Sequence, residues 1–307
     1  MVRSGELLFL KSVKDGIPNR DPLADSDARR LFDEEDGRIS LSDVSIKRDV
    51  RDFVLAKYPD GGPDRRYFIF VREERVNGKL LNRRDLAKSI VEKATGTKEV
   101  TIENIMKSSF DARVFGIVFS VKDESFHRTG PVQFGWAHSL HPVESRYVQG
   151  TVVVPSDENK EQGTIWTTYL VPFAVFLMPG VINATLAKET GMNEDDLALL
   201  FEGLWKGTLH RQARGRGLQQ PLFLLHVEYQ DPFYRIGHLE ETVRLWPSAE
   251  EWRSGIKPSS LQEIEVDVTE LAAVLEREAA HIARVRYMVH PGLRLRGELP
   301  GRVDALW

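Results

Sequence analysis

The order of strands and helices constrains the fold more than any other feature of this sequence. Apolar or alternating segments predict β-strands, and capped segments with an apolar residue every three or four positions predict α-helices. In chain order we expect a strand at 6–14, a helix at 43–57, strands at 114–121 and 132–139, a helix at 194–205 and a strand at 222–229. The order βαββαβ is typical of ferredoxin-like and RNA-recognition-type folds. We therefore predict an α+β fold built on this core.

Local signals support these elements. Ser42 or Asp43 is expected to cap the first helix, and Asn193 the second, by accepting bonds from free backbone N–H groups. The strand at 114–121 has apolar residues on both faces, so we expect it in the middle of a covered sheet. A further helix at 269–284 and a strand at 285–289 extend the C-terminal part.

Two long segments interrupt the core. The first, 59–111, contains an Asn77–Gly78 hairpin signal and a capped helix at 82–94. The second, 141–168, has the pattern of a hairpin with a polar turn at 156–163. An extended hairpin is unstable unless something packs on it, and we expect a neighbouring subunit or a bound strand to do so. No linker or repeat divides the chain, so we predict one elaborated domain.

The charge is unevenly distributed around a net value of -4. Residues 15–36 hold eight acids and three bases, residues 65–88 hold eight bases and three acids, and residues 206–217 hold four bases and no acid. Phosphate binding depends on the local field, so this pattern suits a protein with one face for RNA and another for protein neighbours. It also suits many ordinary enzymes.

Other sequence features bear on the compartment. The chain has no cysteine, which suits a reducing cytoplasm and leaves no thiolate ligand or nucleophile. The longest apolar run, 169–178, is too short to span a bilayer, and the first ten residues do not form a signal peptide. We expect a cytoplasmic protein without a membrane partner.

Motifs for nucleotide hydrolysis and for metals are missing. The sequence has no GxxxxGK[ST] loop and no GxGxxG after a strand. His138 and His141 are close in sequence but lack a third ligand at a zinc-like spacing, so we predict no metal site and no cofactor. Asp15 and Asp21 lie in the first loop. They are either turn-forming residues or carboxylates that bind magnesium and cut RNA.

Two glycine-containing loops are candidates for phosphate contact. The first follows the opening strand and reads KDGIPNRDP, and the second reads ARGRGLQQP at 213–221. Glycine lets backbone N–H groups approach phosphates closely, and the basic side chains supply charge. Lys47, Arg48 and Arg51 share one side of the helix at 43–57, where they either contact a polyanion or form a solvated face.

Together these segments resemble the Cas-seven (Cas7) family, the repeated backbone subunit of type I CRISPR surveillance complexes (Cascade). KDGIPNRDP followed by SDVSIKRDVRDFV resembles the family's opening, and SFDARVFG, GPVQFGWAHSLHPVE and PLFLLHVEYQDPFYRIGHL continue the resemblance. YRIGHL is most similar to the subtype I-B branch, whereas the ARGRG loop blends features of the I-B and I-C branches.

The resemblance implies an RNA-recognition-type palm, here about 1–58, 112–140 and 169–240, with C-terminal additions at 241–307. It implies a finger region at 59–111 and a thumb hairpin at 141–168. Copies stack head to tail along CRISPR RNA, which pairs with target DNA. Other implied partners are the guide-end-capping, large and small Cascade subunits.

The implied role is a non-catalytic RNA-binding scaffold. The alternative is an endonuclease like the backbone subunits of type III complexes, which cut target RNA with a loop aspartate. The candidate RNA-binding residues are Lys14, Asn19, Arg20, Lys47, Arg48, Arg51, His138, Arg146, Arg211, Arg214 and Arg216. The candidate thumb residues, which stack on or separate bases, are Tyr147, Val152 and Trp166.

Overall fold

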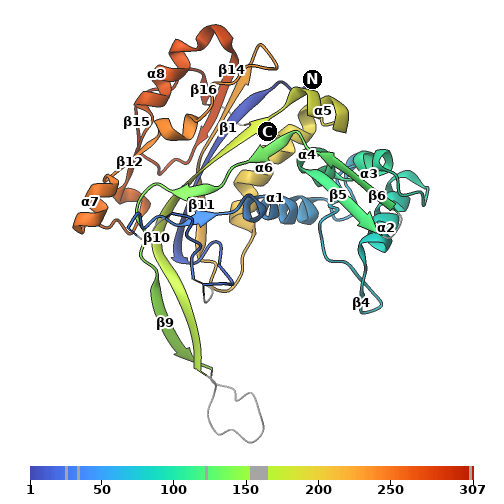
Figure 1. The fold of residues 1–307 in the computed structure, drawn as a ribbon, viewed down its shortest axis with the longest axis horizontal. Helices are drawn as coiled ribbons and strands as arrows, with labels where there is room; N and C mark the ends of the chain where they lie inside the picture. Colours follow the sequence, from blue (N-terminus) through green and yellow to red (C-terminus); the bar gives the residue numbers. More distant parts are fainter. Residues whose placement is uncertain (25–26, 33–34, 122–123, 153–164, 304–305) are drawn as a thin grey trace, which may run out of the picture.

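A long, mainly antiparallel sheet forms the centre of the protein in the computed structural model, which describes residues 1–24, 27–32, 35–121, 124–152, 165–303 and 306–307 (Figure 1). Strand β1 (Gly5–Gly16) lies between β10 (Ile165–Ile182) and β11 (Leu218–Tyr229), antiparallel to both. The order across the sheet is β16-β14-β11-β1-β10-β8-β2. The outer strands are β16 (Arg302–Val303), β14 (Ile282–Val289), β8 (Ala137–Ser139) and β2 (Ser40–Leu41), and β7 (Val132–Phe134) also pairs with β10.

Both faces of the central sheet are covered. Leu7 and Phe9 of β1 join the hydrophobic cluster beneath helices α1 (Asp43–Lys57) and α6 (Glu194–His210), whereas Leu8 and Leu10 join a cluster on the other face. Successive side chains of a strand point to opposite faces, which explains the split. The second cluster includes residues of β12 (Arg244–Trp246), β13 (Glu265–Asp267) and α8 (Thr269–Arg277). Strand β15 (Leu295–Arg296) and helix α7 (Ala249–Ser254) complete that layer.

A third hydrophobic cluster lies in the region to one side of the sheet (Figure 1). This region consists of β3 (Arg75–Val76), β4 (Lys79–Leu80), α2 (Arg83–Thr95), α3 (Ile102–Ser108), α4 (Phe110–Phe115), β5 (Gly116–Val121) and β6 (Glu124–Thr129) and the chain between them. The cluster itself includes side chains of α2, α3, α4, β5 and β6, whereas the side chains of β3 and β4 are exposed. Asn77 and Gly78 have positive φ, as a two-residue hairpin requires. The Asn82 side chain accepts a bond from the Asp85 N–H and caps α2. The predicted hairpin and helix are confirmed.

The prediction that 114–121 forms a central strand is wrong. Residues 110–115 are helical, and β5 pairs with β6 in a separate two-stranded sheet. Its buried side chains, Ile117 and Phe119, face the third cluster, while Val118 is exposed. The place beside β1 is taken by β10, a strand of 18 residues that the predicted order βαββαβ does not contain.

Smaller differences concern the ends of elements. The predicted helix at 269–284 ends at Arg277, and β14 begins at Ile282. The predicted strand at 132–139 is divided into β7 and β8. Ser42 is the N-cap residue of α1 but its side chain accepts no capping bond, whereas Asn193 forms a capping box with Asp196. The remaining helical segments are α5 (Ala184–Thr190) and the 3₁₀ turns η1 (Pro63–Arg65), η2 (Leu239–Thr242), η3 (Leu261–Glu263) and η4 (Ala279–His281).

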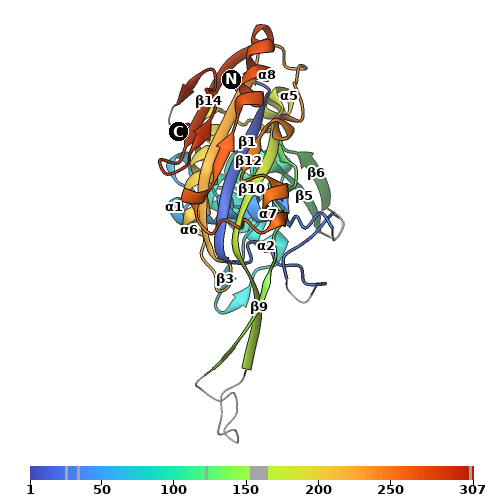
Figure 2. The same cartoon turned by 90° about the vertical axis from the view of Figure 1, so that its left-hand side faces the viewer.

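A narrow hairpin projects from the sheet (Figures 1 and 2). Strand β9 (Arg146–Thr151) pairs with the first residues of β10, which then continues into the centre of the sheet. The predicted hairpin strands are therefore present, and the predicted turn at 156–163 lies outside the described residues. Within the described ranges, no helix is long and apolar enough to cross a membrane.

Candidate nucleic-acid interface

The two glycine loops predicted to contact phosphate lie against each other. The Ile17 N–H donates to the Gly215 carbonyl at 2.9 Å. A Cβ added to Gly16 would lie 2.0 Å from the Gly217 nitrogen, so no larger residue fits at this crossing. The loop after β1 and the loop between α6 and β11 therefore form one continuous surface.

This surface lies at the foot of the projecting hairpin. Arg20, in the first loop, donates to the Thr168 hydroxyl of β10 at 3.1 Å. The exposed guanidinium of Arg214, in the second loop, lies 5.1 Å from the ring centre of Trp166 on β10. Lys14, at the end of β1, is also exposed. Cations beside an aromatic ring suit a nucleic-acid backbone with bases that stack.

A buried ionic cluster supports the two loops from below. The Asp49 carboxylate of α1 contacts Lys11 Nζ at 3.0 Å, Arg216 at 2.7 Å and Arg211 at 3.0 Å. Burial lowers the pKa of Lys11 to about 8, although Asp49 opposes this effect. Burial also lowers the pKa of Arg216. Arg216 therefore lies beneath the surface, and Arg211, also paired with Asp52, is 27% exposed.

Lys11 and Asp49 were missed as site residues. Both are visible in the sequence as charged residues within apolar patterns, since Lys11 interrupts the apolar strand and Asp49 lies on the side of α1 that carries Ile46 and Val50. Such residues are buried only when they are paired. What the sequence does not reveal is that they meet each other and Arg216.

The basic side of α1 is largely engaged within the protein. Arg51 is 12% exposed and pairs with buried Asp111 at 2.9 Å, which also accepts bonds from the backbone N–H groups of residues 70 and 71. Lys47 pairs with Asp43 at 2.8 Å. Only Arg48 of the three predicted cations is mostly exposed, and it pairs with Asp52. Arg51 thus connects α1 to the region of the third hydrophobic cluster.

The other predicted residues are more scattered. His138 lies on β8, where its Nδ1 is 2.9 Å from the Ser40 hydroxyl, and it lines a pocket that contains no residue of the glycine loops. Arg146 and Tyr147 are exposed on β9, and Val152 is exposed near the limit of the described hairpin. Asn19 is half-buried, and its Nδ2 has no hydrogen-bond partner among the described residues.

In the described part of the chain, Asp15, Asp21, His138 and His141 do not come together as potential metal ligands. His141 uses both ring nitrogens, since Nε2 accepts from the Val175 N–H and Nδ1 donates to the Pro142 carbonyl. Burial lowers the pKa of His141 to about 4. Asp21 pairs with Arg29 and accepts from the Leu23 N–H. Asp15 is exposed and has a φ of 54°.

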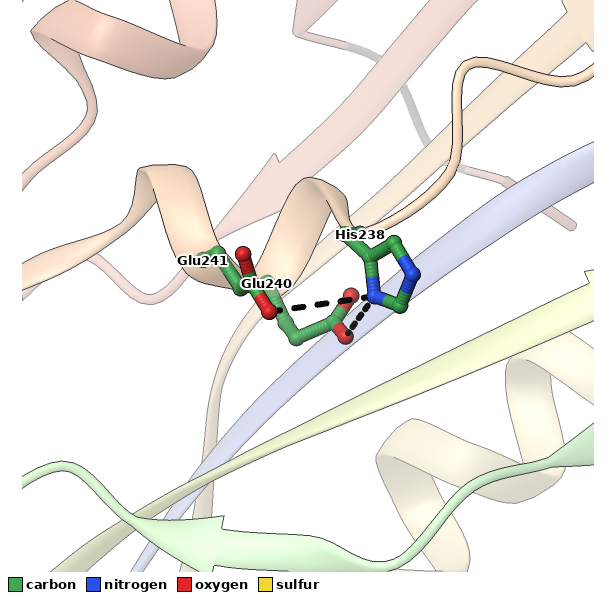
Figure 3. A group of neighbouring side chains, drawn as sticks. All are labelled: His238, Glu240 and Glu241. Carbon is green, nitrogen blue, oxygen red and sulfur yellow. Dashed lines mark ion pairs between the residues drawn. The ribbon is translucent and has the colours of Figure 1, made fainter.

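One further group, His238, Glu240 and Glu241, brings its potential ligand atoms within 4.8 Å of one another (Figure 3). His238 and Glu241 are 80% and 75% exposed, and His238 Nδ1 lies 3.5 Å from Glu240 and 3.8 Å from Glu241. The three residues follow one another on a single turn at the surface, and their ion-pair contacts with each other account for their closeness without a metal ion.

Comparison with known proteins identifies the family. Residues 3–269 match the family model described as CRISPR-associated protein Cas7. The chain belongs to the Cas7 family. The CRISPR-associated protein Cas7 of Haloferax volcanii is 27% identical over 328 residues, covering 98% of this chain and 92% of the relative. A chain of a solved structure described as a CRISPR RNA-guided surveillance complex, pre-nicking, matches with a TM-score of 0.55 and 15% identity over 97% of each chain. This Cas7 chain therefore shares its mixed α+β fold with that structure.

Proposed function

We propose that this Cas7 protein is a non-catalytic backbone subunit that binds CRISPR RNA in a type I Cascade complex and presents the guide to target DNA. The observation that carries this proposal is the joining of two glycine loops at the foot of a projecting hairpin. There Lys14 and Arg214 are exposed and Arg214 stacks beside Trp166. The family assignment and the surveillance complex named in the structural match support it.

The proposed palm is the central sheet with helices α1 and α6, in an RNA-recognition-type arrangement with β11, β1 and β10 adjacent. The proposed thumb is the β9–β10 hairpin. The sequence predicts a finger at 59–111. We propose that it extends to about 129, because β5 and β6 share the third hydrophobic cluster with α2 and α3. The YRIGHL segment supports subtype I-B. It is held by buried Glu6, which accepts from the N–H groups of Ile236 and Gly237.

RNA binding by the exposed cations provides the test. In Lys14→Glu/Arg214→Glu we expect affinity for single-stranded RNA to fall at least about tenfold, and the slope of log affinity against log salt to fall by roughly one per lost phosphate contact. Filter binding with unrelated RNAs of equal length measures both quantities. Similar affinities for these RNAs are expected, because no base-reading motif is present.

Lys98→Glu/Lys107→Glu is the matched control, since it makes the same charge change on the finger. Equal losses in both double variants would show that only net charge matters. A strong preference for one RNA sequence at matched salt would contradict backbone recognition. Magnesium-dependent cuts in a complementary RNA, lost in Asp15→Ala or Asp21→Ala, would establish the endonuclease alternative.

A further inference from the structure

A pocket with a volume of about 1050 Å³ lies away from the glycine loops. It is formed where the edge of the central sheet, with β8 and β10, meets η2 and β12. Its lining includes the aromatic side chains of Phe32, Trp136 and Trp246, and both Phe32 and Trp246 are partly exposed. This surface combines apolar rings with access from solvent.

The pocket has an unneutralised acidic edge. Glu240 and Glu241 line it from η2, and their described ion-pair contacts are with His238 only (Figure 3). The two arginines of the lining already have acidic partners outside it, since Arg38 pairs with Asp36 and Arg244 with Glu270. The third carboxylate of the lining, Asp267, is likewise paired, since it lies 3.9 Å from Arg296. The open charges of the pocket are therefore negative, which favours a cationic occupant and disfavours a phosphate backbone.

A segment with complementary chemistry lies elsewhere on the same chain. In the β3–β4 hairpin, Arg75 is paired across the strands with Leu80, and Val76 with Lys79. All four side chains are exposed. Each face of the hairpin thus carries one cation and one apolar side chain. A two-stranded hairpin without a packed face is marginally stable, so this one is suited to a partner surface.

The pocket and the hairpin lie on opposite sides of the molecule along its longest axis (Figure 1), where β12 and α7 are on one side and β4 on the other. They cannot meet within one chain in this arrangement, but they can meet between two copies. Contact between two different patches of identical chains is heterologous and generates an open assembly.

We propose that the β3–β4 hairpin of one copy docks into the pocket of the next by the face that carries Arg75 and Leu80, with Arg75 against Glu240 and Glu241 and Leu80 against the aromatic rings. Lys79, on the opposite face, adds to the positive field of the hairpin. The inference rests on the proposed function, because assembly along RNA is what brings copies side by side. The inference goes beyond the proposed function, because it names the two surfaces that meet and gives the hairpin a positive charge and the pocket a negative charge. The exposed apolar side chains of the hairpin, Val76 and Leu80, favour a protein surface over nucleic acid as its binding partner.

Charge exchange between the two surfaces tests this contact. Arg75→Glu/Lys79→Glu and Glu240→Arg/Glu241→Arg should each lower the apparent affinity of multi-copy assembly on a long RNA by on the order of tenfold. Both should bind an RNA too short for two copies as the unaltered protein does. The quadruple variant should recover assembly, because each acidic hairpin then meets a basic pocket. An equimolar mixture of the two double variants should also recover it, because alternating copies place hairpins and pockets of opposite charge together. Native mass spectrometry counts the copies, and Lys98→Glu/Lys107→Glu is again the charge control.

The outcomes separate this contact from the proposed function. If the unaltered protein does not bind RNA, the proposed function fails. If it binds and assembles, and the two double variants assemble equally well, only the docking contact is wrong. Loss of short-RNA binding in the hairpin variant would show that the hairpin contacts nucleic acid. Failure of the quadruple variant to recover, while each double variant is impaired, would assign the two surfaces to different partners and overturn the proposal.

Discussion

At the scale of single residues, Asp49 is the centre of the candidate interface although it is fully buried. It contacts one lysine and two arginines, so removing its charge leaves Lys11 and Arg216 buried beside each other without a counter-charge. Both cations belong to the segments that carry the glycine loops. The shape of the surface and the stability of the fold thus depend on the same carboxylate.

We expect Asp49→Asn to lower the free energy of unfolding by about 3–5 kcal/mol, the usual cost of breaking a buried ion pair on one side. Urea denaturation followed by circular dichroism measures this change. Asp52→Asn is the matched control on the same helix, because Asp52 is 26% exposed and its loss should cost less than about 1 kcal/mol. Equal effects of the two substitutions would show that the Asp49 cluster contributes no more than a surface pair.

At the scale of elements, local signals in the sequence were sufficient for some segments and not for others. Helix α1 has the predicted bounds, and the Asn82 and Asn193 caps and the Asn77–Gly78 turn are present. Each depends on residues close together in sequence. The assignment of 114–121 to the central sheet failed, because an apolar strand pattern does not specify which cluster the strand joins. Similarly, the sequence marked the glycine loops but not the meeting of Lys11, Asp49 and Arg216, which are far apart in the chain.

The hairpin element should be dispensable for folding. Among the residues that the structure describes, β9 pairs with β10 alone, and Arg146, Tyr147 and Gln149 are exposed. We expect that replacing 149–163 by a short glycine turn shifts the melting temperature by no more than a few degrees, in line with the small effect of most surface changes. Assembly on RNA and periodic protection of the RNA from nuclease should nevertheless be lost. A collapse of the melting temperature would show that the hairpin is part of the core and would contradict the thumb assignment.

At the scale of the whole molecule, the small net charge is the sum of basic and acidic regions that lie on different parts of the surface. Exposed cations gather at the foot of the hairpin and on β3–β4, whereas Glu240 and Glu241 line a pocket on the side opposite β4. The proposed RNA contact and the proposed contact between copies are therefore both compatible with an acidic chain, because the local field decides each contact. A contact between two different patches on opposite sides of the molecule does not form a closed, twofold-symmetric dimer.

The proposed contacts give an open assembly on RNA, and its length should be set by the RNA. We expect the number of bound copies to rise in proportion to RNA length across a series of one, two, three and four times the shortest RNA that holds a copy. Native mass spectrometry or light scattering coupled to size exclusion gives that number. Without RNA the protein should stay mainly monomeric at micromolar concentration, because the hairpin–pocket contact is small and lacks the guide that spans neighbouring copies. A copy number that stays constant as the RNA is lengthened would indicate a closed ring, and would exclude the head-to-tail arrangement on which both surfaces depend.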